Sequence, residues 1–156
     1  MDLPLDLKYQ IASFDMDIWI RLSYMDDEFK KFSYGIGRKL FIDLFTIIHE
    51  NKHCKFWTIF GKYHRFDDQP AIIFADGEQR WYQNGKLHRD GPEGQPAMID
   101  ANGGREWYQN GQLHRDGPSG QLPAIIYANG QQEWYQNGKL HRDNDKPAVI
   151  DPIGRQ

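Results

Sequence analysis

The chain has little cysteine, no long apolar run and little net charge, and each of these shortages excludes a class of protein. Cys54 is the one cysteine in 156 residues, so an intramolecular disulfide and a cysteine metal cluster are both excluded, which fits a reducing compartment. No stretch approaches the roughly 18 consecutive apolar residues of a membrane helix, and Asp2 and Asp6 precede the first apolar run where a secretory signal would be basic. A net charge of −3 provides no attraction for nucleic acid or anionic lipid. We therefore expect an intracellular protein without a membrane span.

Aromatic residues and glycine are plentiful, and they recur with a period. Aromatics make up 14% of the chain, which also has 15 Gly. Four tryptophans recur at separations of 24, 26 and 27 residues, namely Trp57, Trp81, Trp107 and Trp134. Four histidines follow them, each 7 residues later, at His64, His88, His114 and His141. This periodicity predicts a tandem repeat of one structural unit.

The step from each histidine to the next Pro-Ala pair is the one variable part of the repeat. The Pro-Ala pairs begin 6, 8, 9 and 6 residues after the histidines, at Pro70, Pro96, Pro123 and Pro147. Insertions are tolerated where the backbone is solvated and rejected inside paired strands, so residues 92–95 and 118–122 are predicted to be surface loops. Deleting Glu93 and Gly94 is accordingly expected to change stability little.

Six dipeptides in the repeats have the composition of tight hairpin turns. They are Asp76-Gly77, Asn84-Gly85, Asn102-Gly103, Asn110-Gly111, Asn129-Gly130 and Asn137-Gly138. Read as two-residue type I′ turns, they predict an antiparallel meander.

The same turns predict which side chains face each other across the strands. Each indole is expected to lie between a histidine and an aliphatic side chain, which gives an aromatic stripe. The expected aliphatic partners are Ile72, Met98 and Ile125. Two cross-strand ion pairs are also expected, Glu106 with Arg115 and Glu133 with Arg142.

The string WYQNGKLHRDGP at Trp81, with near copies at Trp107 and Trp134 and a following PAII or PAVI, resembles MORN-type repeats. The resemblance covers residues 45–154 and is closest to the divergent repeats of marseillevirus-like large DNA viruses. It implies an elongated, single-layer antiparallel sheet of hairpins that binds proteins. It also implies a location in the host cytoplasm or the virion.

Residues 1–40 have a different pattern, with apolar residues three and four positions apart and acidic residues at the expected helix starts. We expect short helices here. The run from Leu3 to Phe32 resembles an F-box, a segment that docks on the adaptor subunit of a cullin ubiquitin ligase. The resemblance assigns adaptor binding to Leu3, Pro4, Leu7, Ile11, Phe14 and Leu22. The alternative is a helical cap that only covers the first edge of the sheet.

Candidate catalytic and metal-binding patterns have simpler structural explanations. His-Arg-Asp opens the catalytic loop of protein kinases. Here the tripeptide occurs three times, and the phosphate-binding and metal-binding motifs that kinase catalysis requires are absent from the sequence. Equivalent histidines of successive repeats would lie roughly 10 Å apart, too far to share a zinc ion. Residues 51–156 carry 13 basic and 13 acidic residues, so the aromatic stripe lacks the basic groove of a single-strand nucleic-acid binder. We expect no enzyme activity, no metal and no cofactor.

The sequence therefore predicts a mainly β protein with a small N-terminal α-helical cap, divided into residues 1–40 and 41–156. The leading hypothesis is a protein-interaction module, with the F-box-like segment as a receptor subunit of a host ubiquitin ligase. The alternative is a structural or virion-associated repeat protein that self-assembles. Self-association is expected at the last strand, Ala148, Val149 and Ile150, where two edges could pair in a homodimer of about twice the 18.3 kDa chain mass.

Overall fold

The computed structural model describes residues 46–90, 94–117 and 120–153, and these ranges form a mainly β fold without helices. Apart from Thr46, they belong to one compact unit, Ile47–Gln156. The predicted helical segment 1–40 and its boundary with the repeats lie outside the described residues.

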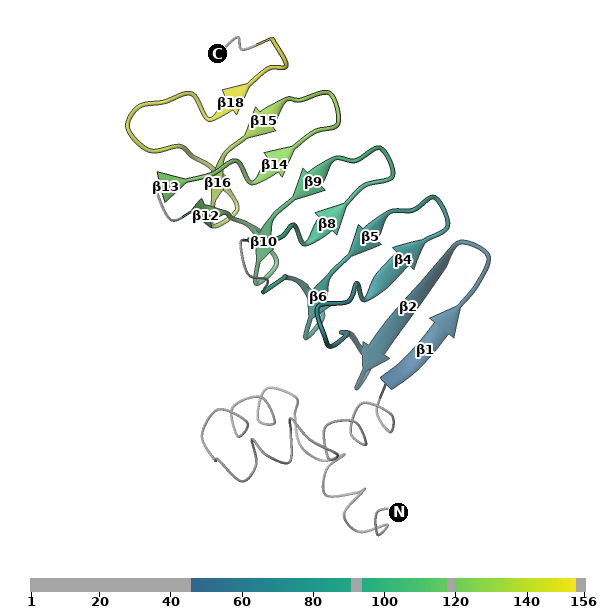
Figure 1. Ribbon diagram of the computed structural model, residues 1–156. Helices are drawn as coiled ribbons and strands as arrows, with labels where there is room; N and C mark the ends of the chain where they lie inside the picture. The colour runs from purple at the N-terminus through teal and green to yellow at the C-terminus, as the bar shows by residue number, and fades with distance from the viewer. Residues whose placement is uncertain (1–45, 91–93, 118–119, 154–156) are drawn as a thin grey trace, which may run out of the picture. The chain divides into compact units, whose positions relative to one another are not determined.

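The strands form an open ten-stranded sheet. Its order is β1-β2-β4-β5-β8-β9-β14-β15-β18, with β3 paired to β2 (Figure 1). The neighbours from β2 to β18 are antiparallel, which confirms the predicted meander. The strands are β1 Thr46–Glu50, β2 Cys54–Ile59, β3 Lys62–Tyr63, β4 Ile72–Phe74, β5 Gln79–Arg80, β8 Met98–Ile99, β9 Arg105–Glu106, β14 Ile125–Ile126, β15 Gln132–Glu133 and β18 Val149–Ile150.

Short hairpins extend the sheet along one flank. After each of β5, β9 and β15, the chain passes through a tryptophan and then forms a two-stranded hairpin around an Asn-Gly turn (Figure 1). A further small hairpin lies in the loop after His114. The pairs are β6 Tyr82–Gln83 with β7 Lys86–Leu87, β10 Tyr108–Gln109 with β11 Gln112–Leu113, β16 Tyr135–Gln136 with β17 Lys139–Leu140, and β12 Asp116–Gly117 with β13 Gly120–Gln121.

The turns at the hairpin tips are two-residue turns, as predicted. Asn84, Asn110 and Asn137 have φ of 51°, 53° and 50°, and each is followed by a glycine with positive φ. Two consecutive positive φ values define a type I′ turn, and asparagine tolerates this left-handed conformation better than most residues. The first repeat makes the same turn with Phe60 at φ 50°.

The turns on the opposite flank are not type I′, and here the predicted register is wrong. Only the glycine has positive φ at Gly77, Gly103 and Gly130, and each glycine N–H donates to the carbonyl three residues before it. This is a type I turn followed by a left-handed glycine, which makes a three-residue connection. The extra residue shifts the pairing by one position, and in a strand such a shift moves every side chain to the other face.

The shift places a small residue opposite each large indole. Ile72 pairs with Arg80, so Ala71 faces Trp81 in place of the predicted Ile72. The equivalent alanines Ala71, Ala97 and Ala124 are all 0% exposed, and the four repeat tryptophans are 3% to 7% exposed. The core of the repeats is thus a row of tryptophans packed against alanines.

The two turn types predict different responses to the same substitution. Asn110→Ala removes the short polar side chain that makes φ of 53° tolerable for asparagine. We expect this substitution to lower the free energy of unfolding by about 1 kcal/mol. Asn102 occupies the second turn type without positive φ, so Asn102→Ala should cost under about 0.5 kcal/mol. Urea unfolding of the two variants tests this difference, and equal losses would contradict the assignment of turn types.

Candidate functional site

Each tryptophan of the repeat is covered by the arginine that follows the repeat histidine. The distances from the guanidinium carbon to the indole centroid are 3.7 Å for Arg65 on Trp57, 4.0 Å for Arg89 on Trp81, 3.7 Å for Arg115 on Trp107 and 3.7 Å for Arg142 on Trp134. Arginine stacks well on aromatic faces because its planar cation is attracted by the ring and only weakly hydrated. Sequence reasoning did not place an arginine on the indole, whereas the predicted backbone pairing of Trp81 with His88 is confirmed by the bond from His88 N to Trp81 O at 3.1 Å.

The same arginines donate to the repeat prolines and do not form the predicted cross-strand ion pairs. Their Nη1 atoms donate to the carbonyls of Pro70, Pro96, Pro123 and Pro147 at 3.0 to 3.2 Å. Glu106 and Glu133 accept instead from the phenols of Tyr108 and Tyr135, at 2.7 and 3.1 Å.

The repeat histidines link each hairpin to the next one. The backbone N–H of Asn110 donates to His88 Nδ1 at 3.0 Å, and the same bond joins Asn84 to His64 and Asn137 to His114. The glycine of each turn adds a second bond, as when Gly111 N donates to Leu87 O at 2.8 Å. The tips at Asn84, Asn110 and Asn137 are thereby each held on the preceding hairpin by two hydrogen bonds.

The other ring nitrogen of the histidine binds an aspartate two residues later. His88 Nε2 lies 2.7 Å from Asp90, His114 Nε2 lies 2.9 Å from Asp116, and His141 Nε2 lies 3.0 Å from Asp143. Because Nδ1 of His88 and His114 accepts from a backbone N–H, the proton of the neutral ring must be on Nε2, which donates to the carboxylate. Nδ1 of these two rings therefore bonds the next hairpin, while Nε2 bonds a residue of its own repeat.

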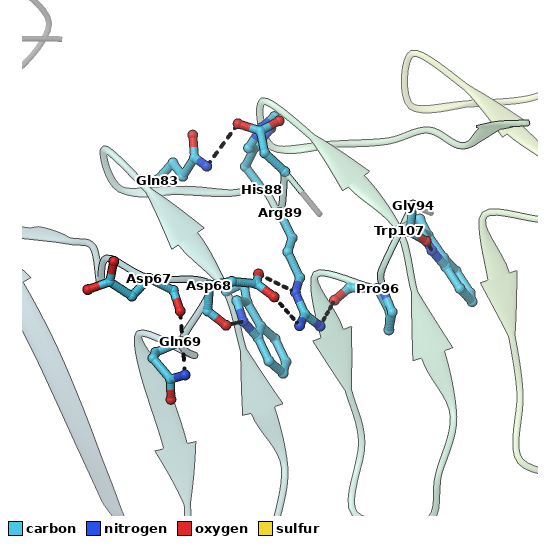
Figure 2. Close-up of polar contacts among 11 residues, drawn as sticks. Asp67, Asp68, Gln69, Gln83, His88, Arg89, Gly94, Pro96 and Trp107 are labelled. Atoms are coloured by element: carbon cyan, nitrogen blue, oxygen red, sulfur yellow. Dashed lines mark hydrogen bonds and ion pairs between the residues drawn. The ribbon is translucent and has the colours of Figure 1, made fainter. Parts of the chain in front are cut away.

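The loops between histidine and proline contact the next tryptophan. Asp68 and Gly94 each lie two residues before the repeat proline and have positive φ, 53° and 58°. The Trp81 indole N–H donates to the Asp68 carbonyl at 3.0 Å, and the Trp107 indole N–H donates to the Gly94 carbonyl. Figure 2 shows both contacts. Gly94 is exposed, as expected for a surface loop, but its carbonyl binds a buried indole, so we now expect deletion of Gly94 to destabilise the repeat.

The loop after His114 departs from this arrangement. It contains the β12–β13 hairpin, and Gln121 occupies the position equivalent to Asp68 without positive φ. In the described ranges, the buried Nε1 of Trp134 has no hydrogen-bond acceptor. The longest loop thus leaves the next indole N–H without the carbonyl that the shorter loops supply.

The sheet presents rows of alternating aliphatic and polar side chains. Cα partners on adjacent strands point to the same face, and successive residues point to opposite faces. One face carries a row that we call the isoleucine row, and all its members except the exposed Arg105 are half-buried. It consists of Ile73, Gln79, Ile99, Arg105, Ile126, Gln132 and Ile150.

The opposite row is more strongly charged. It consists of Ile72, Arg80, Met98, Glu106, Ile125, Glu133 and Val149. Its carboxylates are engaged by neighbouring tyrosines. Burial and the hydrogen bond to Glu106 both raise the pKa of the Tyr108 phenol, so the phenol remains a donor at neutral pH.

The remaining predicted site residues lie at the last strand of the sheet or outside the described ranges. The F-box-like residues Leu3 to Leu22 lie outside them. Val149 and Ile150 form β18, which pairs with β15, while the Ala148 carbonyl accepts from Trp134 N at 2.8 Å. Among the described residues, no strand pairs with the other side of β18.

Neither a metal cluster nor a membrane-spanning helix is found in the described ranges. They contain no group of three or more His, Cys, Asp or Glu placed to hold a metal ion. His49 and His53 have the i, i+4 spacing of a metal-binding pair on a helix, but His49 lies in strand β1, stacks on Phe56 at 4.5 Å and contacts Thr58 Oγ1 at 3.3 Å. No helix in these ranges is long and apolar enough to span a bilayer.

Sequence reasoning missed two functional contacts of the repeat: the arginine over the indole and the loop carbonyl that binds the indole N–H. Arginine follows every repeat histidine, and aspartate or glycine stands two residues before Pro70, Pro96 and Pro147. The second recurrence could have indicated positive φ, since glycine and aspartate are enriched there. No family model, curated protein or solved structure matches the chain. The fold and contacts thus define an open antiparallel β-sheet of hairpin units.

Proposed function

We propose that the protein is a non-enzymatic protein-interaction module. Its sheet is a single-layer MORN-type array that binds a partner protein. Residues 1–40 act as an F-box-like segment that docks on the adaptor subunit of a host cullin ubiquitin ligase. The observation that carries the proposal is the isoleucine row, a line of half-buried aliphatic side chains on an open sheet face.

The chemistry of the repeat supports a binding role. A sheet face with alternating aliphatic and polar side chains is suited to binding another protein. Protein interfaces combine apolar area with hydrogen-bonding groups, and both are present on this face. The groups that could perform catalysis are engaged in contacts within and between the repeats. His88 and His114 have both ring nitrogens engaged, and Arg89 and Arg115 cover indoles. The adaptor-binding part rests on the F-box resemblance of residues 1–40.

Co-purification with the adaptor subunit tests the proposal on the full chain. We expect the tagged protein to retain purified adaptor, and Leu7→Asp to abolish retention because the adaptor contact is apolar. The matched control is Ile99→Asp in the isoleucine row, which should leave adaptor retention intact and weaken capture of the target protein. Circular dichroism spectra of both variants, compared with the parent, serve as the control for folding. A parent chain that fails to retain the adaptor contradicts the ligase role.

A self-assembling structural protein is the second candidate, and it is favoured by the side of β18 on which no described strand pairs. The N–H groups of Ala71, Ala97 and Ala124 each donate to the next strand, and Ala148 occupies the equivalent position in front of β18. This candidate predicts a particle of about twice 18.3 kDa in light scattering. It also predicts that Ala148→Pro, which removes that donor, restores the monomer. A monomeric parent at micromolar concentration would rule out this candidate.

A further inference from the structure

Two equivalent positions in successive loops differ in one functional group. Asp68 and Gly94 both precede the repeat proline by two residues, both have positive φ, and both carbonyls accept an indole N–H from the next tryptophan. Asp68 carries a carboxylate at this place and Gly94 has no side chain. The two loops thus share the same backbone conformation at this position, but only the first loop has a carboxylate there.

The Asp68 carboxylate has a defined role. It accepts from Nε and Nη2 of Arg89, both at 2.7 Å, while Nη1 of the same guanidinium donates to the Pro96 carbonyl at 3.1 Å (Figure 2). This is the bidentate geometry in which arginine binds a planar carboxylate most strongly. Arg89 is therefore satisfied on three sides while it covers Trp81.

Arg115 repeats this arrangement without the carboxylate. Its guanidinium lies 3.7 Å from the Trp107 ring centroid and donates through Nη1 to the Pro123 carbonyl at 3.2 Å. Its Nε is buried and has no acceptor in the described part of the chain. The site that Asp68 fills on Arg89 is unfilled on Arg115.

The space beside Gly94 and the charge of Arg115 both favour a carboxylate that enters at Gly94. Apart from chain neighbours, no described atom lies within 4 Å of the position that a Cβ on Gly94 would take. Burial and the neighbouring cation Arg105 both lower the pKa of Arg115 from its usual value. The guanidinium nevertheless keeps its proton at neutral pH, so a partly buried cation lies near a second cation and forms no ion pair with any described residue.

We propose that Nε and Nη2 of Arg115 bind a carboxylate of the partner protein, an Asp or Glu side chain that enters beside Gly94. The bound carboxylate takes the position that Asp68 occupies on Arg89. The inference rests on the proposed function of the sheet and names the chemistry of its partner. Carboxylate is the expected group because the protein itself places one on the equivalent arginine.

Acetate is the probe for this site, observed through the Nε–H resonances of the arginines in ¹⁵N-labelled full chain. We expect acetate to shift the Arg115 resonance along a saturating curve. The shift should be larger than the one that sodium chloride causes at the same ionic strength. Arg89, already bound by Asp68, should respond no more than it does to chloride. Asp68→Gly should make the Arg89 resonance respond in the same manner as Arg115.

The matched variants at position 94 separate charge from shape. Gly94→Asp supplies the carboxylate internally and should reduce the Arg115 response to the chloride level, since aspartate is accommodated at φ 53° at position 68. Gly94→Asn has the same shape without charge and should retain the acetate response. A response in Gly94→Asp equal to that of the parent overturns the proposal.

Two further outcomes also count against it. An Arg115 resonance that acetate moves no more than chloride does shows that no carboxylate site exists. An equal saturating response to inorganic phosphate shows an unspecific anion site and overturns the assignment to carboxylate. Adaptor retention depends on residues 1–40 and should be unchanged in Gly94→Asp, so failure of this site and failure of the ligase role are distinguishable.

Discussion

Replacing Trp107 with alanine is expected to destabilise the repeat sheet by about 3 to 5 kcal/mol. The indole is 5% exposed, faces the fully buried Ala124, and lies under the Arg115 guanidinium at 3.7 Å. Its removal leaves a cavity, exposes the arginine and deprives the Gly94 carbonyl of its donor. Because each hairpin is bonded to the preceding one, the loss should spread to neighbouring repeats.

Urea unfolding followed by far-ultraviolet circular dichroism measures this effect. Trp107→Phe is the matched control, since it keeps an aromatic ring under Arg115 and loses only the N–H and part of the area. We expect it to cost about 1 to 2 kcal/mol. A Trp107→Ala variant within about 1 kcal/mol of the parent would show that the tryptophan row does not hold the sheet together.

Removing Glu93 and Gly94 is expected to cost about 2 to 4 kcal/mol, because the deletion places Pro92 two residues before Pro96. The described loops hold a residue with φ of 53° to 58° at this place, namely Asp68, Gly94 and Asp145, with the loop after His114 as the exception. The proline ring restricts φ to about −65°, so the loop cannot form there. The hydrogen bond from the Trp107 indole to Gly94 is lost as well.

Removing Pro92 and Glu93 is the matched control for this deletion. It shortens the loop by the same two residues, reproduces the 6-residue step found after His64, and keeps Gly94 in place. We expect its stability to lie within about 1 kcal/mol of the parent, because a change of two residues in loop length has a small entropic effect. If the two deletions unfold at the same urea concentration, backbone conformation at position 94 is not the cause.

The elements that the sequence predicted correctly depend on local chemistry. The Asn84-Gly85, Asn110-Gly111 and Asn137-Gly138 turns form as expected because two positive φ values are a property of the dipeptide itself. The antiparallel meander follows from these turns and from the short segments between them. The variable step between histidine and proline likewise lies in connections between the strands of the main sheet.

The elements that it predicted wrongly depend on a choice between turn types. Asp76-Gly77 and its equivalents are compatible with a two-residue or a three-residue connection, and these differ by one residue in register. Composition around the turn does not distinguish them. The packed sheet selects the three-residue form, in which Ala71, and not Ile72, faces Trp81.

The sequence by itself determined the β class of the repeat region, the period of its unit and the turns at the hairpin tips, because these depend on residues close together in the chain. Only the tertiary structure decided that arginine covers each indole, that His88 bonds to the turn at Asn110, and that Asp68 binds Arg89. The last two contacts join residues 22 and 21 positions apart. Such pairs are set by how adjacent repeats stack, since a long flexible side chain can bond to whichever acceptor the packed neighbour places within reach.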